Sequence, residues 1–363
     1  MTVVTCDEYW ANGWRGPTVF RASAGRLHPA DTARSAAERT DAAIHSSAIH
    51  SSAIHSGAIH IPGTVFAHLT DHHVHLGLIN GSGLLAAGVT RVTDLGWIPS
   101  VAAAWLAANR AAAATSGLPD VSIAGAFLTC AHGYPSASTW APAGSVRQVD
   151  TPADAAAAVS EQAAVGASVV KVVLNSVAGP VLDDDTLHAI VAAAHVRGLS
   201  VVAHTEGTGM AARALVAGAD GLAHTPFTER LDDELLARMA AAGMYWISTL
   251  DIHGWGDPTA EHDTAVDNVR RFAAAGGSVR YGTDLGNGPL PVGVNPRELA
   301  ALASAGLDRN ALVRTIAGSR QPDSFDARFA WVPGLPPERP TDTADWLATA
   351  RGCTLDTLED TLS

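Results

Sequence analysis

The 363-residue sequence has little charge, little cysteine and almost no lysine. Charged residues make up 16% and hydrophobic residues 47% of the chain, a composition typical of a compact globular protein rather than a disordered one. The three cysteines are odd in number and far apart, so they form neither a disulfide framework nor a Cys-x-x-Cys metal pattern. We therefore expect a reducing compartment. With no signal-peptide pattern and no membrane-spanning run, we expect a cytoplasmic protein.

The balance of charge limits the classes of partner. Lys and Arg total 23 against 36 Asp and Glu, a formal net charge of -13. This surplus of negative charge argues against nucleic acid or an anionic membrane as a partner and leaves a small-molecule substrate, with a homo-oligomer also possible. Of the 23 basic residues only Lys171 is a lysine, so a site that needs a primary amine has one candidate.

A short repeat stands out near the N-terminus. The motif "AIHS" recurs at Ala43, Ala48 and Ala53. A five-residue period places successive histidines on neither one helix face nor one strand face, which predicts a loop over residues 43–60. A His-rich metal-binding tract is the alternative, although nothing in the repeat fixes the geometry of ligands.

The region after this repeat alternates between two patterns. Eight β-like runs, from "TVFAHLTDHHVHLG" to "VRYGTDLG", are each followed by an Ala-rich helical segment. Segments such as "DDDTLHAIVAAAHVRG" and "TERLDDELLARMAAAG" begin with acidic or Thr capping residues and end at Gly, as helices do. The alternation predicts an α/β fold with a parallel sheet, closed as a (β/α)8 TIM barrel over residues 64–320. The flanks 1–63 and 321–363 are predicted to form a small β domain from both chain termini.

A histidine cluster lies in the first predicted barrel strand, "TDHHVHLG". Side chains two apart on a strand point to the same face, so Asp71, His73 and His75 share one side. Two imidazoles so placed at the end of a strand can reach one metal ion. A surface strand that carries such a pair by chance is the alternative.

Further chemically active side chains fall at the ends of later predicted strands. They are Lys171 in "SVVKVVLN", His204 in "VVAHTEG", His224 in "GLAHTPF" and Asp284 in "RYGTDLG". Barrel enzymes build their active sites at the C-terminal ends of the strands. We therefore expect these four residues to converge with the histidine pair.

Imidazole and carboxylate groups suit zinc and neighbouring metals, whereas a lysine ammonium repels a cation. The conflict disappears if the Lys171 amine is neutral and has reacted with carbon dioxide to form a carbamate, an anion that can bridge two metals. Burial lowers the pKa of a lysine and so favours this reaction. A lysine paired with a carboxylate inside the barrel is the alternative.

The combination resembles the amidohydrolase superfamily of metal-dependent hydrolases, and the likeness runs from about Pro62 to Gln321. The pattern Asp-x-His-x-His is present at Asp71, His73 and His75. Within the superfamily, "AAGVTRVTDLG" and "HVRGLSVVAHTEGTGMAARALVAGADGLAHTPF" are similar to the branch that holds zinc-dependent prolidases and imidazolonepropionase-like hydrolases.

This resemblance implies a binuclear centre of two divalent metal ions, with Zn²⁺ as the first candidate. The implied ligands are His73, His75 and Asp284 for one ion, His204 and His224 for the other, and an N6-carboxylated Lys171 that bridges them with a hydroxide. The hydroxide would attack a polarised carbonyl, and Asp284 would pass its proton to the leaving nitrogen.

The resemblance also suggests residues that contact the substrate. His132, in "TCAHGYPS", occupies the place of a substrate-binding and catalytic histidine in this branch, and Tyr134 follows it. Trp255, in the loop after the seventh predicted strand, either lines the mouth of the site or packs against the rim of the barrel.

The predicted function is hydrolysis of an amide or cyclic amide C–N bond in a small molecule, such as an N-acyl amino acid or a dipeptide. Deaminases of the superfamily have a glutamate at the third position after the fifth-strand histidine, whereas Glu206 follows His204 at the second. One alternative is a mononuclear deaminase or another reaction of the superfamily, with one metal and a free Lys171 amine. The other is a metal-binding protein without turnover.

Deletion of the repeat separates the last alternative from catalysis. If the chain is a hydrolase with its ligands in the barrel, removal of residues 43–60 should leave hydrolysis nearly intact. If the repeat is a metal sink, the same deletion should remove most of the bound metal, as elemental analysis of the purified protein would show.

Overall fold

The computed structural model describes residues 2–30, 58–111, 118–318, 324–326, 328–358 and 362. The repeat histidines at positions 45, 50 and 55 lie outside the described residues. The last part of the repeat differs from the predicted loop, because Ile59 and His60 open strand β4 (Ile59–Phe66). His60 pairs there with Thr5, so a deletion that tests the repeat must stop before residue 58.

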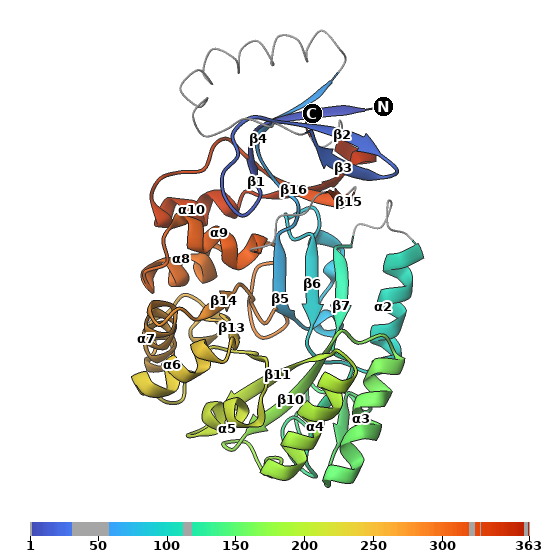
Figure 1. Cartoon of the computed structure of the whole chain (residues 1–363), viewed down its shortest axis with the longest axis vertical. Coiled ribbons are helices and arrows are strands. Elements are labelled where there is room, and N and C mark those ends of the chain that lie inside the picture. Colours follow the sequence, from blue (N-terminus) through green and yellow to red (C-terminus); the bar gives the residue numbers. More distant parts are fainter. Residues whose placement is uncertain are drawn as a thin grey trace.

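A seven-stranded sheet gathers segments from both ends of the chain (Figure 1). Its order is β15-β3-β2-β1-β4-β16-β17, and β1 and β4 are its one parallel pair among the described strands. Tyr9, Phe20 and Phe325 pack their rings within 5.1–6.0 Å of one another in its core. The strands are β1 (Val3–Trp10), β2 (Thr18–Ser23), β3 (Arg26–Pro29), β4, β15 (Phe325–Asp326), β16 (Arg328–Pro333) and β17 (Arg351–Thr354).

The middle of the chain forms two parallel sheets. One has the order β5-β6-β7, and the other has seven strands in the order β14-β13-β12-β11-β10-β8-β9. The bounds are β5 (Thr70–Val74), β6 (Arg91–Asp94), β7 (Asp120–Ile123), β8 (Phe127–Thr129), β9 (Val146–Gln148), β10 (Val169–Asn175), β11 (Ser200–Glu206), β12 (Gly221–Leu222), β13 (Tyr245–Ile247) and β14 (Ser278–Arg280). The predicted α/β class with parallel strands is confirmed.

Backbone contacts join the two parallel sheets at both sides. A parallel bridge links Val74 to Leu285, and the His72 N–H donates to Tyr281 O at 3.0 Å. On the other side the Ser168 N–H donates to Ile123 O at 3.0 Å. The ends of β5 and the segment after β14 therefore lie side by side, although they are far apart in sequence.

Helices follow most of the parallel strands from β6 onward, but β7 is followed directly by β8, and β8 by β9, with no helix between them. The helices are α2 (Pro99–Ala111), α3 (Pro152–Ala164), α4 (Asp184–Val196), α5 (Met210–Ala217), α6 (Asp233–Ala241), α7 (Ala260–Ala274), α8 (Pro296–Ser304), α9 (Arg309–Ala317) and, near the C-terminus, α10 (Pro340–Leu347). The predicted capping is present, since Asp183 accepts the Thr186 N–H at 2.7 Å and Asp232 the Leu235 N–H at 2.7 Å. None of the described helices is long and apolar enough to cross a membrane.

Two departures from the predicted alternation concern the first and third strands. After β5 the chain makes only two single 3-10 turns, η2 (Leu76–Leu78) and η3 (Gly81–Gly83), instead of a full helix. The third predicted strand is split into β7 and β8, which pair in different sheets. Both departures lie beside the C-terminal end of β5, where the histidine cluster is.

Burial on both faces explains the apolar runs of the parallel strands. All seven residues of β10 are buried, as expected for a parallel strand between helices and an inner core. Behind β13, Trp246 stacks on Phe272 of α7 with ring centroids 3.9 Å apart. The covered strands form a rigid base for side chains at their C-terminal ends.

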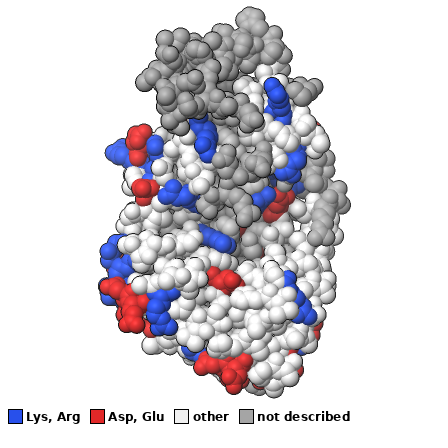
Figure 2. Space-filling view, in the orientation of Figure 1, with Lys and Arg blue, Asp and Glu red and all other residues white. Residues whose placement is uncertain are grey.

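Among the described residues, the face that Figure 2 draws carries no large area of one charge. Figure 2 shows charged side chains of both signs in small groups separated by uncharged surface.

Candidate metal centre

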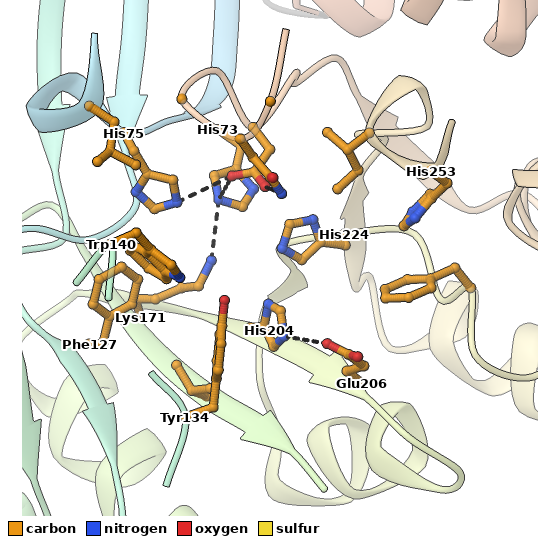
Figure 3. A pocket seen from close by; sticks show the side chains of 18 of the residues that line it. His73, His75, Phe127, Tyr134, Trp140, Lys171, His204, Glu206, His224 and His253 are labelled. Atoms are coloured by element: carbon orange, nitrogen blue, oxygen red, sulfur yellow. Dashed lines mark hydrogen bonds and ion pairs between the residues drawn. The ribbon is translucent and has the colours of Figure 1, made fainter. Parts of the chain in front are cut away.

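Six of the residues selected from the sequence line one cavity of about 400 Å³. Five of them project from the C-terminal halves of the parallel strands or from the residues just after them, whereas Lys171 is the third of the seven residues of β10 and not at the strand end that the sequence predicted (Figure 3). They are His73 on β5, His75 just after it, Lys171 on β10, His204 on β11, His224 after β12 and Asp284 after β14. The predicted convergence is thus present in the described structure.

The Asp284 carboxylate lies between two imidazoles. Its Oδ1 is 3.0 Å from His73 Nε2 and 3.2 Å from His75 Nε2. The His224 ring is 4.7 Å from the His73 ring between centroids, and the His204 ring is 4.8 Å from that of His224. Potential ligand atoms of His73, His224 and Asp284 all lie within 4.8 Å of one another. This group takes His73 and Asp284 from the ligand set that the resemblance implies for one ion and His224 from the set implied for the other.

Neighbouring groups fix the orientation of three imidazoles. His73 Nδ1 contacts Ala223 O at 2.8 Å, and His75 Nδ1 contacts Gly96 O at 3.1 Å. His224 Nδ1 lies 2.9 Å from Thr249 Oγ1. A carbonyl oxygen only accepts, so Nδ1 of His73 and of His75 carries a proton and Nε2 faces the cavity. Such support of the second ring nitrogen is usual for histidines that bind metal.

Two buried polar atoms of the cluster lack a hydrogen bond, namely His204 Nε2 and Asp284 Oδ1. His204 Nε2 comes no closer than 3.5 Å to Glu206 Oε2, and Asp284 Oδ1 has only its close approach to the two imidazoles. A buried polar atom without a partner costs about 1–3 kcal/mol. A cation held by imidazole nitrogen and carboxylate oxygen would remove this cost. The donor set therefore fits a transition metal of the zinc type.

The protonation states suit metal binding. Burial lowers the pKa of His204, and it lowers the pKa of His73 and His224 well below the usual value, so these rings are neutral. Burial alone would raise the pKa of Asp284, but the facing His73 and His75 rings hold it well below its usual range. Metal ligands must be deprotonated, and these groups already are at neutral pH.

Lys171 is 2% exposed and lies at the floor of the cavity. Its Nζ is 3.5 Å from His73 Nε2. Burial lowers the pKa of the amine to about 7, although the charges of Asp284 and Asp94 oppose this shift. Near neutral pH a large fraction of the amine is therefore unprotonated and nucleophilic.

Asp71 holds the two ends of this centre together. Its Oδ1 accepts the His73 N–H at 3.0 Å and the Thr283 N–H at 3.1 Å, and its Oδ2 accepts the Thr283 hydroxyl at 2.5 Å. One carboxylate thus connects β5 with the segment that carries Asp284. Asp284 has φ of +56°, a left-handed conformation that is rare outside glycine and recurrent at active sites. The sequence placed Asp71 on the face of the histidine pair but gave no sign of this contact.

Asp94 has a similar role that the sequence did not reveal. It is fully buried at the end of β6 and accepts the Leu76 N–H at 2.8 Å and the Gly96 N–H at 3.2 Å. Gly96 O is the group that contacts His75 Nδ1. Asp94 therefore fixes the backbone on both sides of the His75 ring.

The three predicted substrate residues have different positions. Tyr134 lines the cavity, with its ring stacked at 5.5 Å from that of His204. Trp255 also lines the cavity, is 43% exposed and donates its indole N–H to Asn287 O at 3.2 Å. His132 is exposed and is not among the lining residues, so the structure does not bring it to the centre.

The cavity also has lining residues that the sequence had not singled out as part of the site. They include Phe127, Trp140 and Phe227. Trp140 lies in an irregular segment and Phe227 in the loop after β12, where no periodicity marks them. His253 and Glu206 also line the cavity: the sequence led us to expect the loop with His253 and Trp255 at its mouth, whereas Glu206 stood out only for its spacing from His204.

Comparison with known proteins finds no matching family model and no matching curated protein. Solved structures do match over nearly their whole length. A structure titled amidohydrolase shares 19% identity over 94% of this chain and 95% of its own, with a TM-score of 0.69. The chain has the amidohydrolase fold. The resemblance inferred from the motifs is thus confirmed at the level of fold.

Other matching structures carry the names of hydrolases. A Xaa-Pro dipeptidase with bound methionine has a TM-score of 0.72 and 17% identity, over 96% of this chain and 97% of its own. Ochratoxinase of A. niger has a TM-score of 0.70 and 17% identity, over 95% and 92% of the two chains. Phenylurea hydrolase B has a TM-score of 0.69 and 14% identity, over 96% and 94%. These neighbours differ in substrate, so the fold does not select one.

Replacement of Asp71 tests whether it holds the centre together. Asp71→Ala leaves three buried donors without an acceptor, and we expect the free energy of unfolding to fall by about 2–4 kcal/mol. Bound metal per chain should fall as well, because His73 and Asp284 lose their common support. Asp71→Asn is the matched control, since its amide oxygen can still accept both backbone N–H groups. Denaturant unfolding and elemental analysis measure the two effects, and equal behaviour of both variants would refute the role.

Proposed function

We propose that this protein is a cytoplasmic, metal-dependent hydrolase that cleaves an amide or cyclic amide C–N bond of a small molecule. The observation that carries the proposal is the gathering of four imidazoles, the Asp284 carboxylate and the buried Lys171 amine around one cavity. Imidazole and carboxylate with an open cavity beside them are the components of a catalytic metal site. The hydrolase names of the structural neighbours support the same class of reaction.

We also propose that the parallel strands form one closed (β/α)8 barrel. The backbone contacts of Val74 with Leu285 and of Ser168 with Ile123 support closure, because they join the two parallel sheets at both sides. In this arrangement the mixed sheet from the chain ends is the small β domain. Its strand β4 crosses the boundary that we placed between residues 63 and 64.

The proposed cofactor is a pair of divalent ions, Zn²⁺ in the first instance. The residues that would hold them are His73, His75, His204, His224, Asp284 and a carboxylated Lys171. When bound, such ions polarise a carbonyl group and lower the pKa of water. The unprotonated Lys171 amine would attack carbon dioxide, form a new N–C bond and release a proton. The product is a carbamate, which replaces a cation that opposes metal binding by an anion that favours it.

Asp284 would move the proton during hydrolysis. As a carboxylate at neutral pH, it can accept a proton from the attacking water while the oxygen forms a bond to the amide carbon. It would then give this proton to the leaving nitrogen as the C–N bond breaks. The products are a carboxylic acid and an amine, so atoms and charge balance. His73 and His75 flank Asp284 and keep its oxygen at the floor of the cavity.

One observation favours a mononuclear enzyme as the second candidate. Among the described residues, the group of three potential ligands whose atoms all lie within 4.8 Å of one another consists of His73, His224 and Asp284. A single ion held there would leave Lys171 as a free amine and would suit deamination or a related reaction. The metal content of the protein separates the two candidates.

Replacement of Lys171 tests the bridging role. We expect two transition-metal ions per chain in the wild-type protein and at most one in Lys171→Ala, with a loss of hydrolysis of at least about 100-fold. A small carboxylic acid should restore part of the activity of the variant, because it can replace the carbamate. Rescue by a small amine instead would indicate an ion-pairing lysine. Wild-type activity in Lys171→Ala would exclude the bridge.

Replacement of Asp284 tests the proton transfer. Asp284→Asn has nearly the same shape but cannot accept the proton, so we expect kcat to fall by at least about 1000-fold with an unchanged circular dichroism spectrum. Asp257→Asn, an exposed residue in the loop after β13, makes the same change of charge outside the cavity. It should keep the wild-type rate. Activity of Asp284→Asn close to that of this control would contradict the assigned role.

A further inference from the structure

One wall of the cavity is aromatic. Phe127 and Trp140 pack edge to face with ring centroids 5.7 Å apart, and Tyr134 lies 6.1 Å from Trp140. The Trp140 ring is also 5.9 Å from that of His75, so this wall adjoins the metal centre directly. Figure 3 shows the three aromatic residues on the same side of the cluster, around Lys171. An aromatic ring of a ligand can stack or pack edge to face against such a wall.

His253 lies on the opposite side of the cluster in Figure 3, and Phe227 and Trp255 also line the cavity. The rings of Phe227 and His253 lie 4.1 Å apart between centroids. His253 Nε2 is buried and has no hydrogen-bond partner. Burial also lowers the pKa of His253 to about 4, so the ring is neutral near pH 7. This part of the lining therefore offers apolar surface and one uncharged hydrogen-bonding atom, but no positive charge.

The charges in the cavity are unusual for a site that binds amino acid derivatives. Among the described lining residues there is no arginine, and Lys171 is the one lysine. The carboxylates are Asp284 at the floor and Glu206, whose Oε2 accepts the Asn175 side-chain N–H at 2.6 Å. Arg297 is engaged outside the lining, where its Nε lies 2.8 Å from Asp251 Oδ1. Away from the metal centre, the walls thus present one anion and no cation.

This distribution has a direct consequence for the substrate. A dipeptide or an N-acyl amino acid carries a carboxylate one carbon away from the scissile nitrogen. Proteins hold such a group with arginine, lysine or several aligned N–H donors, because a charge taken out of water must be paired. Away from the proposed metal ions, the carboxylate would meet aromatic rings, a neutral imidazole and the Glu206 carboxylate. The other polar groups of this lining are uncharged, and the Asn287 side-chain amide already donates an N–H to Asp284 Oδ2 at 3.0 Å. An uncharged aromatic group of a substrate needs no charged partner, so its burial against these rings carries no such cost.

We infer that the substrate is an uncharged aryl amide, that is, an amide with at least one aromatic group and no carboxylate. The inference rests on the proposed hydrolase function and names the substrate class of the same site. A cavity of about 400 Å³ is within the range of sites for drug-sized molecules and accommodates an amide with an aromatic ring on each side. The class differs from the Xaa-Pro dipeptides that the name of one structural neighbour implies.

A matched pair of ligands tests the inference by binding alone. N-(2-phenylethyl)benzamide and N-benzoylphenylalanine have the same two rings and the same amide, and they differ only in the carboxylate. Titration calorimetry on the full chain should give at least 10-fold tighter binding of the neutral compound. Equal or tighter binding of the carboxylate would overturn the inference, and so would failure of the neutral compound to bind at millimolar concentration.

Hydrolysis of the same pair by the metal-loaded protein is a separate measurement. Release of 2-phenylethylamine, with at least a 10-fold higher kcat/KM than release of phenylalanine, would support the function and the substrate class together. If the neutral compound binds more tightly but is not hydrolysed, the inferred substrate class is retained and the hydrolase function is refuted. If N-benzoylphenylalanine is hydrolysed faster, the hydrolase function is retained and the substrate class is refuted.

Two variants assign the selectivity to particular side chains. Glu206→Gln removes the wall carboxylate with little change of shape. The dissociation constant of N-benzoylphenylalanine, divided by that of N-(2-phenylethyl)benzamide, should therefore fall at least 3-fold. Trp140→Leu should raise the dissociation constant of N-(2-phenylethyl)benzamide at least 5-fold more than that of N-butylbutanamide, which has no ring. A purely structural effect would weaken the binding of all these ligands equally. If the ratios of the dissociation constants are unchanged in both variants, Glu206 and Trp140 do not determine the selectivity.

Discussion

The Asp71 carboxylate is the contact on which the candidate metal centre depends. It takes two donors from Thr283 and one from His73, and so it ties the first parallel strand to the segment after the last one. Burial raises the pKa of Asp71 to about 7, while hydrogen bonds from Thr283 and His73 act in the opposite direction. Because of this connection the Asp284 carboxylate stands 3.0 Å from His73, in a left-handed backbone conformation that a local sequence would rarely adopt.

Burial is the second constraint. It lowers the pKa of His73, His204 and His224, and it lowers the pKa of Lys171 to about 7, which suits metal binding. Burial opposes the ionisation of Asp284, but the facing His73 and His75 hold its pKa well below the usual range. The same burial makes unpaired atoms such as His204 Nε2 costly. A cation between these atoms would interact with the lone pairs that have no partner in the protein. The burial that the packed strands produce thus favours the metal binding that the proposed chemistry needs.

The strands and the central residues could be predicted because both follow a local pattern. Apolar runs mark the parallel strands, and polar side chains toward the ends of these runs lie at one end of the sheets, as with His73 and His204. Lys171 is instead the third of the seven residues of β10. The wall residues could not be predicted in this way. Trp140 and Phe227 lie in loops, whose course depends on packing rather than on periodicity. For the same reason His132, chosen by resemblance, lies outside the cavity that Tyr134 lines.

The sequence alone determined the α/β class, the set of residues at the strand ends and the scarcity of positive charge, since these depend on residue type and spacing. The tertiary structure decided which of them meet. Asp71 and Thr283 are 212 residues apart, and no local pattern reports a contact over that distance. It also decided that the cavity walls are aromatic and that Lys171 is the one lysine or arginine among the described lining residues, because chain packing brings loops from several strands to one place.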